Sequence, residues 1–296
     1  MLILTLLCLT LATIVLAFSV RNLRGTTLVT AGGWSLAGVI LWWLAVLCDN
    51  LNPAGTGTTD VLFYSTAVLL LCPGIAVLGA RRPGAGAWNF FVLIPLLAVL
   101  LWPALASSQF LLAEAPLELE FPTLIGFALV LIMGVGNYFG TRFTLPSLLH
   151  ATTLVLIVAS MSPAADMFPE RGSSRHWASL TFALAVVVAS LRAGESAEGL
   201  APLDRLWLDF VDQFGLVWAK RVMDRLNEAA RHENWSAEFQ WHRIHWPDAT
   251  AEEQKRTAER IEHTVRWLFK RFVEPDWIDG RLNEAAAPQE SPPAPD

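Results

Sequence analysis

The first two-thirds of the chain consist of seven long runs of apolar residues separated by short polar connections. A helix that crosses a lipid bilayer needs roughly 20 predominantly apolar residues, because lipid offers no hydrogen-bond partner to an open backbone. The runs cover residues 2–20, 26–48, 61–80, 88–106, 121–140, 145–161 and 177–191. The last two are shorter than the others and would need local thinning of the bilayer. The pattern therefore predicts an all-α membrane domain over residues 1–192 with seven transmembrane helices.

Basic residues occur at every second connection between these runs. They are Arg21, Arg24, Arg81, Arg82, Arg142 and Arg192. The other connections carry acidic or mixed charges, and we expect Asp49, Asp60 and Arg175 to lie in them. Because cytoplasmic loops are enriched in Lys and Arg, this alternation predicts an outside N-terminus and a cytoplasmic C-terminus in the inner membrane. No basic residue precedes the first run, so we expect a retained helix rather than a signal peptide.

The pattern changes after residue 192. The whole chain is 54% hydrophobic and only 16% charged, whereas soluble domains carry about 25% charged residues. Residues 1–192 hold 8 Lys/Arg and 7 Asp/Glu, while the remainder holds 13 and 20, a net charge of −7. This difference indicates that lipid surrounds the first part and water the second. We therefore predict a linker over residues 193–202, a cytoplasmic helical module over 203–282 and a disordered Pro-rich tail over 283–296.

Two amphipathic helices are predicted in the cytoplasmic module. The first runs from about residue 203 to 231, and its apolar positions follow 4-3-4-3 spacing with a slight drift near the middle. These positions are Leu203, Trp207, Phe210, Phe214, Val217, Trp218, Val222 and Leu226. The second helix begins at a capping box formed by Thr250 and Glu253 and runs to about residue 272. Its apolar seam consists of Ala258, Ile261, Val265, Leu268 and Phe272.

A tryptophan-rich segment, residues 234–248, joins these two helices and is expected to be extended. The apolar helix faces must be buried against each other, a second copy, a protein partner or the membrane surface. The net charge of −7 disfavours anionic lipid and nucleic acid, both of which attract basic surfaces. We therefore expect self-packing, with dimerisation or the binding of a protein partner. The predicted partner-binding residues are Trp207, Phe210, Phe214, Trp218, Trp241, Trp246 and Trp267.

Polar residues also gather where the fifth and sixth apolar runs meet, in the stretch 134–150. The predicted ligand-binding residues there are Asn137, Tyr138, Arg142 and His150. Together these side chains offer contacts to an anionic headgroup or a small polar ligand. The alternative is structural: Arg142 as a cytoplasmic anchor, Asn137 as a helix-end cap and His150 as a hydrogen bond between helices.

Several functional classes are disfavoured by what the sequence lacks. No Asp, Glu, Lys or Arg lies well inside any apolar run, and proton and ion pathways rely on such groups. The seventh run has no lysine for retinal, and His150 and His176, at opposite ends of the topology, do not suit b-type haem. The three cysteines lack metal-ligand spacing, and His242 and His245 on a strand would point to opposite faces. We therefore predict no cofactor and no metal site.

The function expected from this pattern is that of a non-catalytic scaffold or subunit of a membrane assembly. One alternative is a carrier or flippase for a neutral or lipid-like substrate, with the 134–150 residues as its polar contacts. Another is a membrane enzyme at the cytoplasmic face with His150 as general base. The sequence shows no nucleophile or metal partner within the same stretch, so an enzyme is the least favoured of the three.

Overall fold

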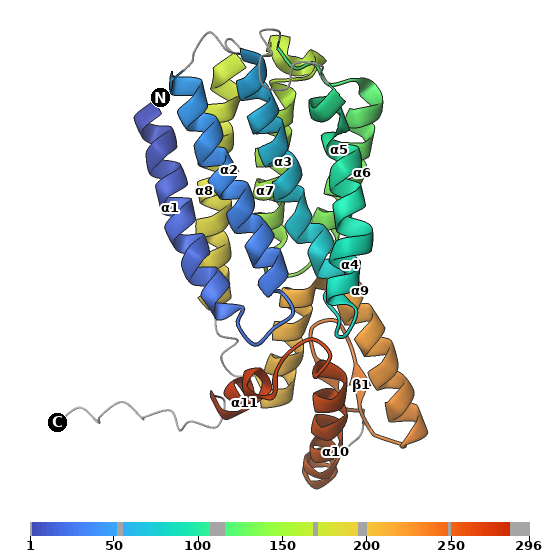
Figure 1. Ribbon diagram of the computed structural model, residues 1–296. Helices are drawn as coiled ribbons and strands as arrows, with labels where there is room; N and C mark the ends of the chain where they lie inside the picture. Colours follow the sequence, from blue (N-terminus) through green and yellow to red (C-terminus); the bar gives the residue numbers. More distant parts are fainter. Residues whose placement is uncertain are drawn as a thin grey trace, which may run out of the picture. The chain divides into compact units, whose positions relative to one another are not determined.

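All seven apolar runs form helices in the computed structural model (Figure 1). The helices of the first part of the chain are α1 (Leu2–Asn22), α2 (Val29–Leu51), α3 (Thr56–Leu78), α4 (Ala85–Trp88), α5 (Ile94–Ala106), α6 (Phe121–Gly136), α7 (Thr144–Ala159) and α8 (Arg171–Gly194). A π-helical turn, Asn89–Leu93, joins α4 to α5, and a 3-10 turn, Pro163–Met167, precedes α8. Five helical stretches are long and apolar enough to cross a membrane, while α6 and α7 are shorter. These are the helices of an α-helical membrane protein.

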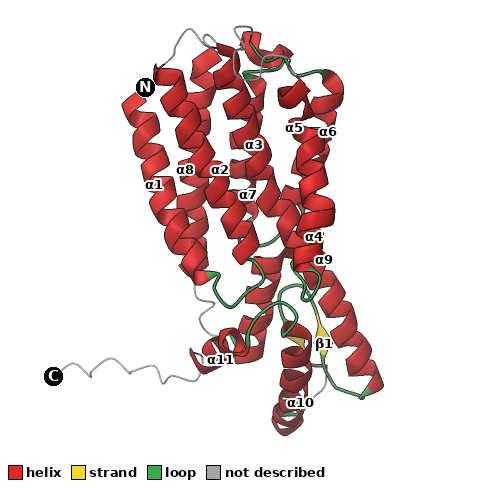
Figure 2. Ribbon diagram, in the orientation of Figure 1, coloured by secondary structure: helices red, strands yellow, loops and turns green. Residues whose placement is uncertain are grey.

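The structure describes six stretches of the chain, and helices make up nearly all of them (Figure 2). They are residues 2–51, 56–106, 116–167, 171–194, 200–247 and 250–284. The chain divides into two compact units, Met1–Glu195 and Ser196–Asp296. Half of the predicted linker over residues 193–202 and most of the predicted tail over residues 283–296 lie outside the described residues.

Helix lengths differ from the sequence prediction at two of the seven runs. The seventh run, expected to be short, belongs to α8, which has 24 residues and begins at Arg171. The fifth run ends early, because α6 stops at Gly136 after 16 residues. An apolar run in the sequence ends at the first charged residue. The helix itself can extend past that residue when its charge is paired. Arg175, inside α8, is such a residue.

Helix α3 lies at the centre of the first unit and packs against α2, α5, α6 and α7. Its side chains Phe63 and Tyr64 are buried, together with Trp42 of α2. The approach to α6 is close enough to require glycine, since a Cβ added to Gly74 would lie 3.0 Å from the Cα of Gly134. Small residues allow this kind of backbone contact between membrane helices. Many large apolar side chains on the outer helices remain exposed, as expected for a surface in lipid.

The second unit consists of three helices and a small hairpin. Its elements are α9 (Pro202–His232), β1 (Glu238–Phe239), β2 (Ile244–His245), α10 (Ala251–Phe269) and α11 (Pro275–Glu284). The strands pair antiparallel, with Phe239 opposite Ile244. The Asn227 side chain of α9 donates to the Phe239 carbonyl at 2.9 Å and accepts from the Phe239 N–H at 2.7 Å. Four residues of the tryptophan-rich segment are therefore in strands, which bears out its predicted extended conformation only in part.

Stacked aromatic rings form the core of the second unit. Phe210 of α9 lies 4.2 Å from Phe269 of α10 and 4.8 Å from Phe214, measured between ring centroids. On α10, Ile261, Val265 and Phe269 are the fully buried positions. Phe269 therefore takes the core position that the sequence assigned to Leu268, because α10 keeps one straight α-helical face. The predicted capping box is confirmed, with the Glu253 N–H donating to Thr250 Oγ1 at 3.3 Å.

Helix α9 is interrupted at Gly215, whose backbone has φ 74° and ψ 179°. This conformation is nearly restricted to glycine. The break re-aims the second half of α9, so that Trp218 is buried while Val217 is 37% exposed. The drift in the apolar spacing falls at this break, and the expectation that Val217 belongs to the buried stripe was wrong. One continuous helix would keep a single stripe.

Replacing Gly215 by alanine is expected to destabilise the second unit by about 1–3 kcal/mol, because a Cβ is strained at this φ and ψ. The free energy of unfolding, measured by denaturant titration of the full chain in mild detergent, checks this. Gly280 in α11 is a matched control, since a Cβ there meets open space. Equal effects of the two substitutions would contradict the prediction.

Asp204, in the first turn of α9, accepts a hydrogen bond from the Ile244 N–H at 2.6 Å. Burial raises the pKa of its carboxyl above the ordinary value, and this outweighs the lowering by the Ile244 hydrogen bond and by Arg243. A raised folded pKa means that the group's contribution to stability is complete below its unfolded pKa and is lost as pH rises through its folded pKa.

Asp204→Asn removes this titration and keeps an oxygen that accepts from Ile244. We therefore expect the variant to gain stability relative to the native protein as pH rises from acid to neutral. Melting temperatures of both proteins across that pH range test the sign. Asp204→Ala, which removes the acceptor, should be less stable than Asp204→Asn at every pH. A difference between Asp204→Asn and the native protein that does not change with pH would refute the expectation.

Candidate functional site

The threonine hydroxyls of the turn between α6 and α7 form hydrogen bonds within the turn. The Tyr138 carbonyl accepts from the hydroxyls of Thr141 at 2.8 Å and Thr144 at 2.9 Å. The Thr141 hydroxyl in turn accepts from the Phe143 N–H at 3.2 Å. Gly140, at φ 79°, allows the chain to reverse here. The threonines of this stretch are therefore explained by the turn itself.

The predicted ligand-binding residues lie around this turn and inside α7. Asn137 is buried at the end of α6, and Tyr138, next to it, is half-buried. The Arg142 guanidinium lies over the Phe143 ring, 5.4 Å from its centroid. His150 is directed across to α3 instead, and its ring lies 6.2 Å from that of Phe182 in α8. The ligand-binding role of this set stays a prediction.

His150 contacts a backbone oxygen of α3 near a proline. Its Nε2 lies 2.9 Å from the Leu70 carbonyl, three residues before Pro73 in α3. The Tyr64 hydroxyl makes an equivalent contact, donating to the Leu100 carbonyl at 2.6 Å, three residues before Pro103. Proline has no N–H and weakens the regular hydrogen bonding of the turn before it. Both polar side chains therefore tie a bent helix to its neighbour.

His150→Leu is expected to destabilise the first unit by about 0.6–1.7 kcal/mol, the range for hydrogen bonds between membrane helices. His150→Gln, which keeps an N–H donor, should lose less. The two variants are compared by titrating the detergent-solubilised chain with a denaturing detergent and following helicity. If glutamine and leucine are equally destabilising, the Leu70 hydrogen bond contributes nothing.

A buried ion pair is the most distinctive polar feature of the first unit. Asp60 lies in the second turn of α3 and is 3% exposed, and Arg175 lies in the second turn of α8 and is 8% exposed. Arg175 Nη2 donates directly to Asp60 Oδ1. The second carboxylate oxygen, Oδ2, accepts from the Leu117 N–H at 3.0 Å. Both oxygens of Asp60 are therefore paired.

Further groups surround the Arg175 guanidinium. Its Cζ lies 4.4 Å from the centroid of the Phe63 ring, and its Nε donates to Ser160 Oγ at 3.4 Å. Asp49, at the end of α2, brings a carboxylate oxygen within 3.9 Å of Nη1. The pair thus ties together α2, α3, α8, the end of α7 and the segment 116–120.

The expectation that Asp60 and Arg175 lie in loops was wrong, since both lie in the second turn of a helix, just before the apolar run that the helix contains. Each charge borders an apolar run, and the sequence shows neither the extension of the helix nor the partner. One feature of the sequence could have predicted this pair. Asp60 and Arg175 have opposite charges and precede apolar runs that start on the same predicted side of the membrane. Helices that begin together place such residues at the same depth.

The chemistry of this pair favours a structural tie. The guanidinium of arginine offers a rigid, planar set of donors that matches a carboxylate. Paired with Asp60, Arg175 forms a neutral unit whose hydrogen bonds compensate for loss of water. Ionisable groups inside membrane helices are the first place to look for function. Here the contacts of the pair connect five segments of the first unit.

In the second unit, the predicted partner-binding residues fall into two groups. Trp207, Phe210, Phe214 and Trp218 are buried and contact Phe239, Phe269 and Phe272 of the same unit. Trp241 and Trp267 are exposed, and Trp246 is half-buried. The first group builds the module's own core, as the self-packing alternative predicts. Partner binding by the second group, which is exposed or half-buried, stays a prediction.

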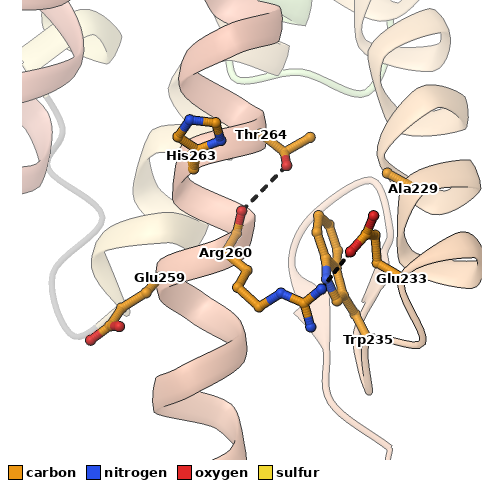
Figure 3. Close-up of a pocket in the computed structure, with 7 residues that line it drawn as sticks. All are labelled: Ala229, Glu233, Trp235, Glu259, Arg260, His263 and Thr264. Atoms are coloured by element: carbon orange, nitrogen blue, oxygen red, sulfur yellow. Dashed lines mark hydrogen bonds and ion pairs between the residues drawn. The ribbon is translucent and has the colours of Figure 1, made fainter.

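An open pocket of about 470 Å³ lies between the end of α9 and α10 (Figure 3). Its lining residues are Ala229, Glu233, Trp235, Glu259, Arg260, His263 and Thr264. Arg260 reaches across it to pair with Glu233, and the indole of Trp235 lies beside this ion pair. Within the described part of the chain, the buried Trp235 Nε1 has no hydrogen-bond partner. The pocket therefore combines an aromatic wall, an arginine and an unused donor.

No protein-family model, curated protein or solved structure matches this chain. The geometry of the two units carries the functional argument.

Proposed function

We propose that the protein is a non-catalytic scaffold or subunit of a membrane assembly. The observation that carries this proposal is the use of the polar groups in the first unit. His150, Tyr64 and the Asp60–Arg175 pair each connect one helix to another. A cavity between α3 and α5 has about 10 Å³ and an apolar lining, which is room for about one water molecule. A carrier would need a larger, polar-lined path.

The proposal includes seven crossings of the inner membrane with an outside N-terminus and a cytoplasmic second unit. Arginines at alternate connections support this orientation. It places the Asp60–Arg175 pair near the outer surface and the Arg142 turn at the cytoplasmic surface. Reporter fusions after α8 and within the 82–84 connection test it, and both reporters should report a cytoplasmic position. Opposite signals from the two would exclude this topology.

The second unit supplies the docking function in this proposal. Because its aromatic core is satisfied internally, its outer surface is free to bind a protein partner or a second copy. The pocket beside Trp235 and Arg260 is the proposed contact, since tryptophan and arginine are enriched among residues that dominate binding energy.

Purification of the full chain from native membranes in mild detergent, with mass determination of the complex, tests the scaffold role. We expect a dimer or a stoichiometric partner that is lost in Arg260→Glu. Arg256→Glu, one turn away on the same helix and paired with exposed Glu252, is the matched control and should retain it. A monomer that brings no partner, in both the native protein and the control, would refute the proposal.

A further inference from the structure

A tryptophan and two cations form an exposed cluster at the C-terminal end of α10. Trp267 is 49% exposed, although most of the tryptophans that the structure describes in this unit are covered. The Lys270 Nζ lies 5.7 Å and the Arg271 Cζ 5.3 Å from the centroid of its ring. We call Trp267, Lys270 and Arg271 the α10 patch. Trp267 lies on the side of α10 opposite Ile261, Val265 and Phe269, and Lys270 and Arg271 directly follow the helix.

The two cations of the α10 patch carry no ion pair among the residues that the structure describes. Elsewhere on α10, Arg256, Arg260 and Arg266 each pair with a carboxylate. Arg221, Arg231 and Lys255 likewise lack an ion pair among the described residues of this unit. Lys270 and Arg271 differ from them because both lie beside one exposed indole. They leave positive charge beside an exposed indole.

The chain tethers the start of the second unit close to a lipid surface. Helix α8 is long and apolar enough to cross a membrane and ends at Gly194, while α9 begins at Pro202. Eight residue steps span at most roughly 30 Å even when fully extended. The second unit therefore starts within that distance of the bilayer surface at which α8 ends. A surface tethered so closely is a partner at high effective concentration.

We infer that the α10 patch docks the second unit onto the anionic surface of the protein's own membrane. An indole prefers the headgroup region of a bilayer. Lysine and arginine beside it are attracted to anionic headgroups and can keep their charges there while their stems lie on apolar groups. Two cations and one tryptophan suit this surface better than a neutral one.

The negative net charge of the second unit is compatible with this inference and determines which face of the unit approaches the lipid. An anionic surface repels the acidic remainder of the unit and attracts the patch, so we expect the patch to face it. Because surface charges are screened within about 10 Å at ordinary salt, the local charge decides the contact. Docking through this one patch fixes which face of the unit is turned to lipid.

The test uses the full chain in nanodiscs that hold one copy each, with Cys8, Cys48 and Cys72 replaced by alanine. His263→Cys, one turn before Trp267 on the same face, carries an environment-sensitive fluorophore. Headgroup-labelled lipid quenches the fluorophore when α10 lies on the surface. We expect strong quenching in discs of phosphatidylglycerol with phosphatidylcholine, weak quenching in phosphatidylcholine alone, and loss of the difference at high salt.

Lys270→Gln with Arg271→Gln should shift the docking equilibrium roughly tenfold or more toward the free unit, and Trp267→Ser should weaken it independently. Lys220→Gln with Arg225→Gln removes the same charge from exposed positions of α9 and should leave quenching unchanged. Thermal unfolding, compared with that of the native protein, checks that the cysteine-free background and each variant are folded. Quenching that is the same in both lipids and in both double variants overturns the inference. Single-copy discs contain no other protein, so this result is independent of the scaffold proposal.

Discussion

Asp60→Ala is expected to destabilise the first unit by about 3–5 kcal/mol, because it leaves the Arg175 charge buried without its partner. Arg175 is 8% exposed, so water cannot replace the lost carboxylate. The substitution also removes the acceptor of the Leu117 N–H. The free energy of unfolding of the detergent-solubilised chain, measured by titration with a denaturing detergent, gives the size of the loss.

Two further variants separate charge from packing at this pair. Asp49→Ala removes a carboxylate that is 47% exposed and 3.9 Å from the guanidinium, and exposed pairs contribute only ~0–1 kcal/mol. Asp60→Leu combined with Arg175→Met removes both charges and should recover most of the stability lost in Asp60→Ala. If Asp49→Ala is as harmful as Asp60→Ala, the buried pair is not what holds these segments.

Phe210→Ala is expected to destabilise the second unit by about 3–5 kcal/mol, the usual range for truncating a buried phenylalanine. The ring is fully buried and contacts Phe214, Phe269 and Phe272. Its removal leaves a cavity at the point where α9 meets α10. Hydrogen exchange of the full chain resolves the effect, which should appear as faster exchange in α9 and α10.

Val217→Ala is the control for this substitution, since that side chain is 37% exposed and surface changes usually stay within about 0.5 kcal/mol. The sequence pattern places both residues on one stripe and predicts similar effects, whereas the structure predicts a large difference. Comparable losses in the two variants would show that the break at Gly215 does not separate them.

Local features were readable from the sequence because they depend on residues that are close together in the chain. Each apolar run forms a helix, since a run of this length has no other way to satisfy its backbone in lipid. The capping box at Thr250 and Glu253 formed as predicted, because its residues lie within one helical turn. The excess of acidic residues after residue 192 likewise coincides with a separate compact unit.

The candidate sites depended on contacts between distant residues. The Asp60 carboxylate binds a guanidinium 115 residues away, and no local window shows that pairing. Four aromatic residues proposed as partner contacts lie in the unit's own core, because burial is shared among α9, α10 and the hairpin. The sequence did not distinguish Trp267 from those four, and only the structure shows that they are buried while Trp267 is exposed.

The sequence alone determined that the first two-thirds of the chain have the composition of a membrane domain and the last third that of a water-exposed one. It also determined which stretches are helical. Composition and periodicity suffice for this, since solvent preference and helix formation act over one or two turns. Only the tertiary structure decided which charges pair, where α9 breaks and which aromatic side chains remain at the surface. Those outcomes depend on what each side chain meets after the helices pack, and two sequences with the same periodicity can meet different neighbours.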